Sequence, residues 1–122
     1  MDVYHDGRLV FGFEVTYVNE SDQSKIFQVG HHIGNHLTGD VQCSTFDFNE
    51  GEYISQFNTM AGDLVDKVKF FTNQGRQFEA GGNGGALNMA QMSAVSNPRV
   101  VAVGGGLGGH MHHFRVYYVQ NQ

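Results

Sequence analysis

The sequence has little of several features that would define other classes of protein. It has one cysteine, one proline and no tryptophan among 122 residues, and 7 basic residues against 12 acidic ones, for a formal net charge of −5. The lone Cys43 excludes an intrachain disulfide, although it could pair with a second chain if it is exposed. The shortage of positive charge leaves no basic face for phosphates, so we expect no nucleic-acid partner.

Long hydrophobic runs are also missing. No apolar run approaches the roughly twenty residues that a transmembrane helix needs, so no membrane insertion is expected. The first residues, MDVYHDGRLVFGF, lack the basic start and apolar stretch of a signal peptide. The triplet Asn19-Glu20-Ser21 is a glycosylation sequon, which matters only in a secreted protein. The sequence does not define the cellular compartment, and it slightly favours a secreted protein.

What the sequence does contain is typical of an all-β protein. Seventeen glycines without a period of three indicate many tight turns. Apolar residues alternate with period two in the segments 11–18, 44–49, 65–72 and 113–119, which predicts strands. The segment 85–96 fits a short helix as well as it fits a strand and a loop. A chain of this length is expected to form one domain over residues 1–122.

Three segments of the chain superpose without gaps. They are GRLVFGFEVTYV from Gly7, GDLVDKVKFFTN from Gly62 and GGHMHHFRVYYV from Gly108. Apolar residues share two offsets in all three copies: Phe13, Val68 and Phe114 at the first, and Val15, Phe70 and Val116 at the second. Three copies of one β unit can bury their inner faces by packing three sheets around a common axis, so we expect a pseudo-threefold prism.

The repeats resemble those of a known family. The run EGEYISQFNTMAGDLVDKVKFFTNQGRQFEAGGNGG (50–85) is similar to the central repeat of jacalin-related lectins. Residues 99–119 resemble the last repeat and residues 2–17 the first. The resemblance implies an all-β, β-prism I fold of three four-stranded Greek-key sheets, with carbohydrate-binding loops at one end.

The resemblance also contains a departure. The family begins with a glycine-rich loop and a strand that precede the segment matched by residues 2–17. A sheet edge left uncovered has unpaired backbone donors and acceptors, which favours strand addition by a partner. We therefore expect a homodimer.

The family resemblance also implies a binding loop. Family members that bind glucose or mannose carry a Gly-x-x-x-Asp loop, whose aspartate accepts from two neighbouring sugar hydroxyls while backbone amides donate. The sequence GDLVD matches this pattern, and GGNGG (81–85) matches its glycine-rich companion. The implied carbohydrate-binding residues are Gly62, Asp63, Leu64, Val65, Asp66, Gly84 and Gly85. The implied partners are glycans or glycoproteins.

The other two repeats depart from the pattern. Phe11 replaces the aspartate in the first, and a phenyl ring cannot accept a hydrogen bond from a hydroxyl group. In the third, His112 takes that position, and a neutral imidazole offers one acceptor in place of two charged oxygens. A second, degenerate site is therefore expected at Gly108, Gly109, His110 and His112. The alternative function is a structural or interaction module that keeps the prism and has lost sugar binding.

Other chemistry finds little support in the sequence. His110 and His112 would share one face of a strand and could bind zinc or copper, but no third ligand lies at a fixed spacing, so we predict no metal and no cofactor. Asp63 and Asp66 lack the further acidic residue that would form a glycosidase cleft. Neither Cys43 nor Ser44 has a sequence context that marks a nucleophile. The chain is not expected to be an enzyme.

Overall fold

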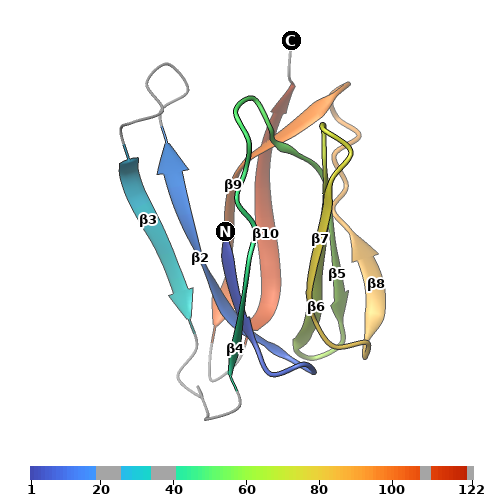
Figure 1. Ribbon diagram of the computed structural model, residues 1–122. Helices are drawn as coiled ribbons and strands as arrows, with labels where there is room; N and C mark the ends of the chain where they lie inside the picture. The colour runs from blue at the N-terminus through green and yellow to red at the C-terminus, as the bar shows by residue number, and fades with distance from the viewer. Residues whose placement is uncertain (19–25, 34–40, 108–110, 121–122) are drawn as a thin grey trace.

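A computed structural model describes residues 1–18, 26–33, 41–107 and 111–120, with the backbone alone for residues 17, 18, 26–33, 107 and 112. These residues form ten strands and no helix (Figure 1). Accordingly, no helix in the described part is long and apolar enough to cross a membrane.

The strands form three antiparallel sheets. The first contains β1 (Asp2–His5), β2 (Val10–Val18), β3 (Ile26–Ile33) and β4 (Gln42–Thr45), in the order β3-β2-β1-β4. The second contains β5 (Ile54–Ala61), β6 (Val65–Thr72), β7 (Gln77–Gly81) and β8 (Ala86–Met89), in the order β7-β6-β5-β8. The third pairs β9 (Pro98–Leu107) with β10 (Met111–Gln120). In the first two sheets three strands follow one another and the fourth returns to pair with the first, which is a Greek key.

The all-β class and the three sheets agree with the prediction, but the third sheet differs in size. It has two strands among the described residues and not the expected four. The reason lies in the pairing, because the other eight described strands are all used by the first two sheets. The outer edges of β9 and β10 therefore have no neighbouring strand in the described part of the chain.

Two local predictions needed adjustment. The strand expected over 44–49 ends at Thr45, because its partner β1 offers only the four residues Asp2–His5 for strand pairing. Segment 85–96, which fitted a helix or a strand, forms strand β8 at its start and irregular turns after it.

The internal repeat is visible in the strands. β2, β6 and β10 begin at Val10, Val65 and Met111, which occupy the same offset in the three aligned copies. These residues are 0%, 1% and 0% exposed, so each copy places its first strand residue in the core. The pseudo-threefold arrangement predicted from the sequence is confirmed.

Phenylalanine rings from all three sheets meet in the core. The ring of Phe114 on β10 stacks on Phe13 of β2, with centroids 5.0 Å apart, and lies 5.5 Å from Phe57 of β5. Phe57 in turn stacks on Phe70 of β6 at 6.3 Å. Such aromatic pairs add to the free energy that burial alone provides, so this cluster holds the sheets against one another.

A buried carboxylate ties together the connections before β5 and after β6. Glu52, whose side chain is 0% exposed, accepts hydrogen bonds from Arg76 Nη1 at 2.7 Å and Thr72 Oγ1 at 2.7 Å. The backbone N–H of Asn49 is a third donor at 2.9 Å. Burial opposes ionisation of Glu52, but these donors outweigh it and hold the pKa of the carboxyl below its ordinary value. The network fixes this end of the second sheet.

Candidate functional site

In each repeat the strand that follows the first loop, namely β2, β6 or β10, carries a β-bulge at its second residue. The register between β5 and β6 passes from Ala61↔Val65 to Met60↔Lys67, so Asp66 is the extra residue. Phe11 is skipped in the same way between β1 and β2, and His112 between β9 and β10. A bulge re-aims the side chain that it carries. The fold therefore sets apart the one position in each repeat where the sequence shows Asp, Phe or His.

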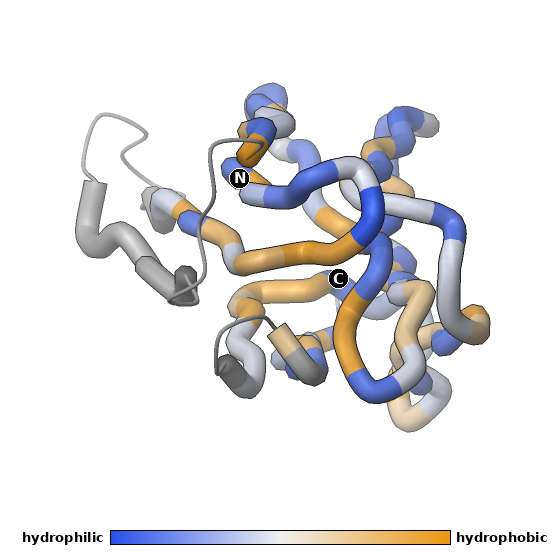
Figure 2. The backbone as a smooth tube through the Cα atoms, turned by 90° about the horizontal axis from the view of Figure 1, so that it is seen from below, coloured by the Kyte–Doolittle hydropathy of each residue, from blue (hydrophilic) through white to orange (hydrophobic). Residues whose placement is uncertain are grey.

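Asp66 and the glycine-rich loop lie together, as the sequence predicted. A Cβ placed on Gly84 would stand 2.5 Å from Asp66 Oδ2, so only a glycine can lie this close to the carboxylate. Gly85 packs against the backbone of Ala61, the last residue of β5. The β5–β6 and β7–β8 connections lie at the same end of the molecule (Figure 1), and Figure 2 looks onto that end.

Backbone hydrogen bonds fix the two loops. The N–H of Gly82 donates to the carbonyl of Asp66 at 2.8 Å, which fastens the glycine-rich loop to the bulge. The N–H of Gly62 donates to the carbonyl of Leu64 at 3.1 Å and closes the short turn between β5 and β6. Lys67 Nζ donates to Asn83 Oδ1 at 2.8 Å and braces the far side of the loop. The geometry around Asp66 is therefore preorganised.

The remaining predicted residues divide by exposure. Gly62 and Asp63 are exposed, and so are Gly84 and Gly85, while Leu64 is half-buried. Val65 is 1% exposed and belongs to the core, so it can offer a ligand its backbone alone.

The Asp66 carboxylate is available to a ligand. It is half-buried, and within the described residues it makes no hydrogen bond and no ion pair. The nearest lysine in sequence, Lys67, is engaged with Asn83 and with Glu79, 3.8 Å away. An ionised carboxylate accepts hydrogen bonds and donates none, so this group suits neighbouring hydroxyls.

The corresponding loop of the first repeat is ordered in a different way. Phe11 is 1% exposed and fills the core at the position of Asp66. Asp6 Oδ1 accepts the N–H groups of Arg8 and Leu9, each at 2.9 Å, and the N–H of Leu9 is the main reason that the pKa of Asp6 is lowered. In this loop the carboxylate of Asp6 accepts hydrogen bonds from the loop's own backbone. The bulge residue, Phe11, offers no acceptor to a ligand.

A serine and a histidine that no sequence motif links lie together beside this loop. His5 Nε2 is 2.8 Å from Ser44 Oγ, while His5 Nδ1 accepts the N–H of Gly7 at 3.2 Å. Burial lowers the pKa of His5, so the ring is neutral near pH 7 with its proton on Nε2. That nitrogen donates to Ser44 and cannot take its proton, so the pair does not form an activated nucleophile.

The degenerate site and the metal ligands fall partly outside the described residues. Gly108, Gly109 and His110 lie there, and for His112 only the backbone is described. Among the residues that the structure does describe, no group of three or more potential ligands could hold a metal ion.

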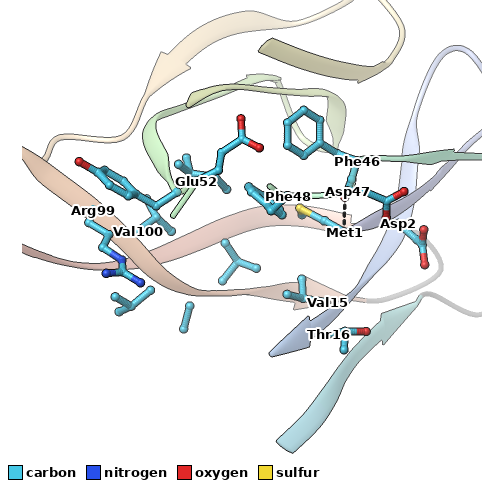
Figure 3. Close-up of a pocket in the computed structure, with 15 residues that line it drawn as sticks. Met1, Asp2, Val15, Thr16, Phe46, Asp47, Phe48, Glu52, Arg99 and Val100 are labelled. Atoms are coloured by element: carbon cyan, nitrogen blue, oxygen red, sulfur yellow. Dashed lines mark hydrogen bonds between the residues drawn. The ribbon is translucent and has the colours of Figure 1, made fainter. Parts of the chain in front are cut away.

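A hollow of about 450 Å³ lies beside β9 (Figure 3), and no residue of the Asp66 loop lines it. Val100 and Arg99 of β9 face it on one side, and Met1 and Phe46 line another part, where the N-terminal amine donates to the carbonyl of Phe46 at 2.8 Å. The hollow adjoins β9, which is one of the two strands of the third sheet, and the outer edges of both strands lack a neighbour among the described strands.

Comparison with known proteins agrees with this architecture. The family described as Jacalin-like lectin domain matches residues 1–117. The chain therefore belongs to the Jacalin-like lectin domain family, whose members bind carbohydrate and are not enzymes.

The same comparison identifies individual proteins that are similar to this chain. The chain is 37% identical over 91 residues to griffithsin from Griffithsia sp. (strain Q66D336), a match that covers 74% of this chain and 69% of griffithsin. The lectin MPA, solved with T-antigen disaccharide, superposes with a TM-score of 0.77 at 18% identity, and the match covers 96% of this chain and 87% of the MPA chain. Artocarpin, solved with Me-alpha-mannose, gives 0.73 at 18% identity, with 96% and 79% covered. The two solved structures confirm the β-prism fold.

Proposed function

We propose that this lectin binds glucose- or mannose-type glycans, free or on glycoproteins, at the Asp66 loop. The observation that carries the proposal is the open carboxylate of Asp66 with Gly84 held against it. In this arrangement Asp66 accepts from two neighbouring hydroxyls of one sugar. The amides of residues 63–66 and of Gly84 and Gly85 donate to the remaining oxygens, since the Gly62 amide is already bonded to the carbonyl of Leu64.

The affinity of such a site is modest. One carboxylate and a few amides on an open surface bind a monosaccharide at around millimolar strength, which is about 4 kcal/mol. The first repeat adds no equivalent site, because Phe11 is buried where the acceptor would be.

A calorimetric or NMR titration tests the proposal. Methyl α-mannoside, methyl α-glucoside and methyl α-galactoside are added in turn to the wild-type chain, to Asp66→Asn and to Asp63→Asn. We expect mannoside or glucoside binding that Asp66→Asn removes and that Asp63→Asn, an exposed carboxylate in the same loop, preserves. Binding of the galactoside alone would overturn the assignment of sugar type.

A blank result has a separate meaning. If no glycan on a broad array binds at neutral or acidic pH, the chain is an interaction module that keeps the prism without sugar binding. The first repeat would be consistent with this outcome, because the buried Phe11 lies where the acceptor would be.

We also propose that the chain forms a homodimer through the third sheet. The outer edges of β9 and β10 lack neighbours among the described strands, and Val101, Tyr117 and Val119 on these strands are 44%, 50% and 47% exposed. Open edges with apolar side chains favour added strands from a partner. Light scattering over a dilution series is expected to give twice the chain mass, and a monomer at every concentration would refute the dimer.

A further inference from the structure

The loop of the first repeat lies directly against the candidate sugar site of the second. Gly82 is buried in the glycine-rich loop, and a Cβ there would stand 2.6 Å from Arg8 Cα and 2.7 Å from the carbonyl oxygens of Gly7 and Arg8. The N–H of the same Gly82 bonds the carbonyl of Asp66. One residue thus has the backbone of Arg8 on one side and that of Asp66 on the other.

This neighbouring loop is rigid at its base and free at its tip. Asp6 Oδ1 accepts the N–H groups of Arg8 and Leu9, and His5 Nδ1 accepts that of Gly7. The side chain of Arg8 is 83% exposed, and its contact with Asp6 Oδ2 is long, at 3.9 Å. A fixed backbone, which lies against the glycine-rich loop at Gly82, therefore presents an exposed guanidinium.

We propose that Arg8 forms a second subsite, which binds the sugar residue next to the one held by Asp66. The inference rests on the function proposed above and extends it from a monosaccharide to a disaccharide or longer glycan. A guanidinium carries five donors and no acceptor, so it suits the hydroxyl and ring oxygens of a second sugar.

The charges around Arg8 favour a neutral second sugar over an acidic one. Asp6 offsets the guanidinium at 3.9 Å, and the exposed carboxylate of Asp63 belongs to the neighbouring loop. Among the described residues of these two loops, the carboxylates of Asp6, Asp63 and Asp66 outnumber the guanidinium of Arg8, so the loops have no surplus of positive charge to attract an anion. The ligand class is therefore a neutral, mannose- or glucose-type oligosaccharide.

The test compares mono- and disaccharides on four proteins. Methyl α-mannoside and the α-linked mannobioses are titrated into the wild-type chain, Arg8→Ala, Arg115→Ala and Asp66→Asn. Arg115 is an exposed arginine on β10 of the third sheet, so its substitution makes the same change of charge elsewhere. Equal unfolding midpoints show that each variant is folded.

We expect at least one mannobiose to bind wild-type protein about five- to tenfold more tightly than methyl α-mannoside, as one added hydrogen bond of ordinary strength on an exposed surface provides. Arg8→Ala should lose that gain in affinity and leave the monosaccharide Kd unchanged, while Arg115→Ala should change neither.

An Arg8→Ala variant that keeps the full gain overturns the subsite while the Asp66 site stands. Tighter binding of a sialylated or sulfated disaccharide overturns the neutral class. A wild-type chain that binds no sugar, or binding that survives Asp66→Asn, overturns the proposed function and the subsite with it.

Discussion

Gly84 lies against Asp66 so closely that a Cβ at position 84 would stand 2.5 Å from the carboxylate oxygen Oδ2. Real Cβ atoms do not approach a heavy atom this closely, so Gly84→Ala must displace the carboxylate. We expect sugar binding to weaken by about tenfold or more, because a hydrogen bond to a charged group is lost. NMR titration with methyl α-mannoside measures the change.

Gly104→Ala is the matched control for this substitution. A Cβ at Gly104 meets no atom within 4 Å, so binding and the unfolding midpoint should stay at wild-type values. Unchanged binding in Gly84→Ala would show that the sugar does not use the Asp66 carboxylate in the position described.

Restoring an aspartate in the first repeat should not create a sugar site. Phe11 is 1% exposed, so Phe11→Asp removes a core ring and buries a charge, which costs about 4 kcal/mol or more of the free energy of unfolding. Chemical denaturation measures the loss, and Phe11→Leu, which keeps an apolar side chain, should cost much less. A folded Phe11→Asp chain that binds a second sugar would contradict this expectation.

Arg76→Ala should destabilise the chain by about 2 kcal/mol, because it leaves the buried Glu52 carboxylate without its cationic donor. The guanidinium itself is 41% exposed, which keeps the loss below that of a fully buried pair. Lys69→Ala breaks an exposed pair with Glu79 at 3.8 Å and should change the free energy of unfolding by about 0.5 kcal/mol or less. Equal effects of the two substitutions in denaturant titrations would rule out a special role for the Glu52 network.

The pH dependence of stability should reflect His5. Burial lowers its folded pKa below the ordinary value of 6.5, so the unfolded chain binds a proton first as the pH falls. Stability from His5 is thus complete above pH 6.5, declines as the pH falls toward the folded pKa, and is lost below it. His5→Gln should flatten this part of the curve. Parallel curves for wild type and His5→Gln would exclude this role.

The sequence predicted the parts of the fold that depend on short-range patterns. Phe13, Val68 and Phe114 share one offset in the aligned copies, and all three lie in the core or pack against it, because each copy must bury the same face. Asp66 and Gly84 are drawn from one repeat, 18 positions apart, and the hairpins that join them are visible as glycine-rich turns. That these residues bind sugar remains a prediction.

Other features depend on contacts between distant segments and left no local signal. The glycines at 104–106 lie in strand β9 and not in a turn, and there Gly105 leaves room for Met111 and Gly106 for the His113 ring. Residues 5 and 44, which form the histidine–serine pair, and residues 8 and 82, which meet across sheets, are separated by most of a repeat or more. The two-strand size of the third sheet likewise depends on which strands find partners and not on their own sequence.

The contact of Gly82 with both Asp66 and Arg8 has a consequence for how such a protein can be rearranged. The three copies look like interchangeable modules, but the proposed binding surface is shared between adjacent ones. A single copy moved into another scaffold would carry Asp66 and its glycine-rich loop, and would leave behind the arginine that borders them. On this proposal the order of the copies along the chain is part of the recognition surface, and shuffling them is expected to change which glycans bind while each hairpin stays intact.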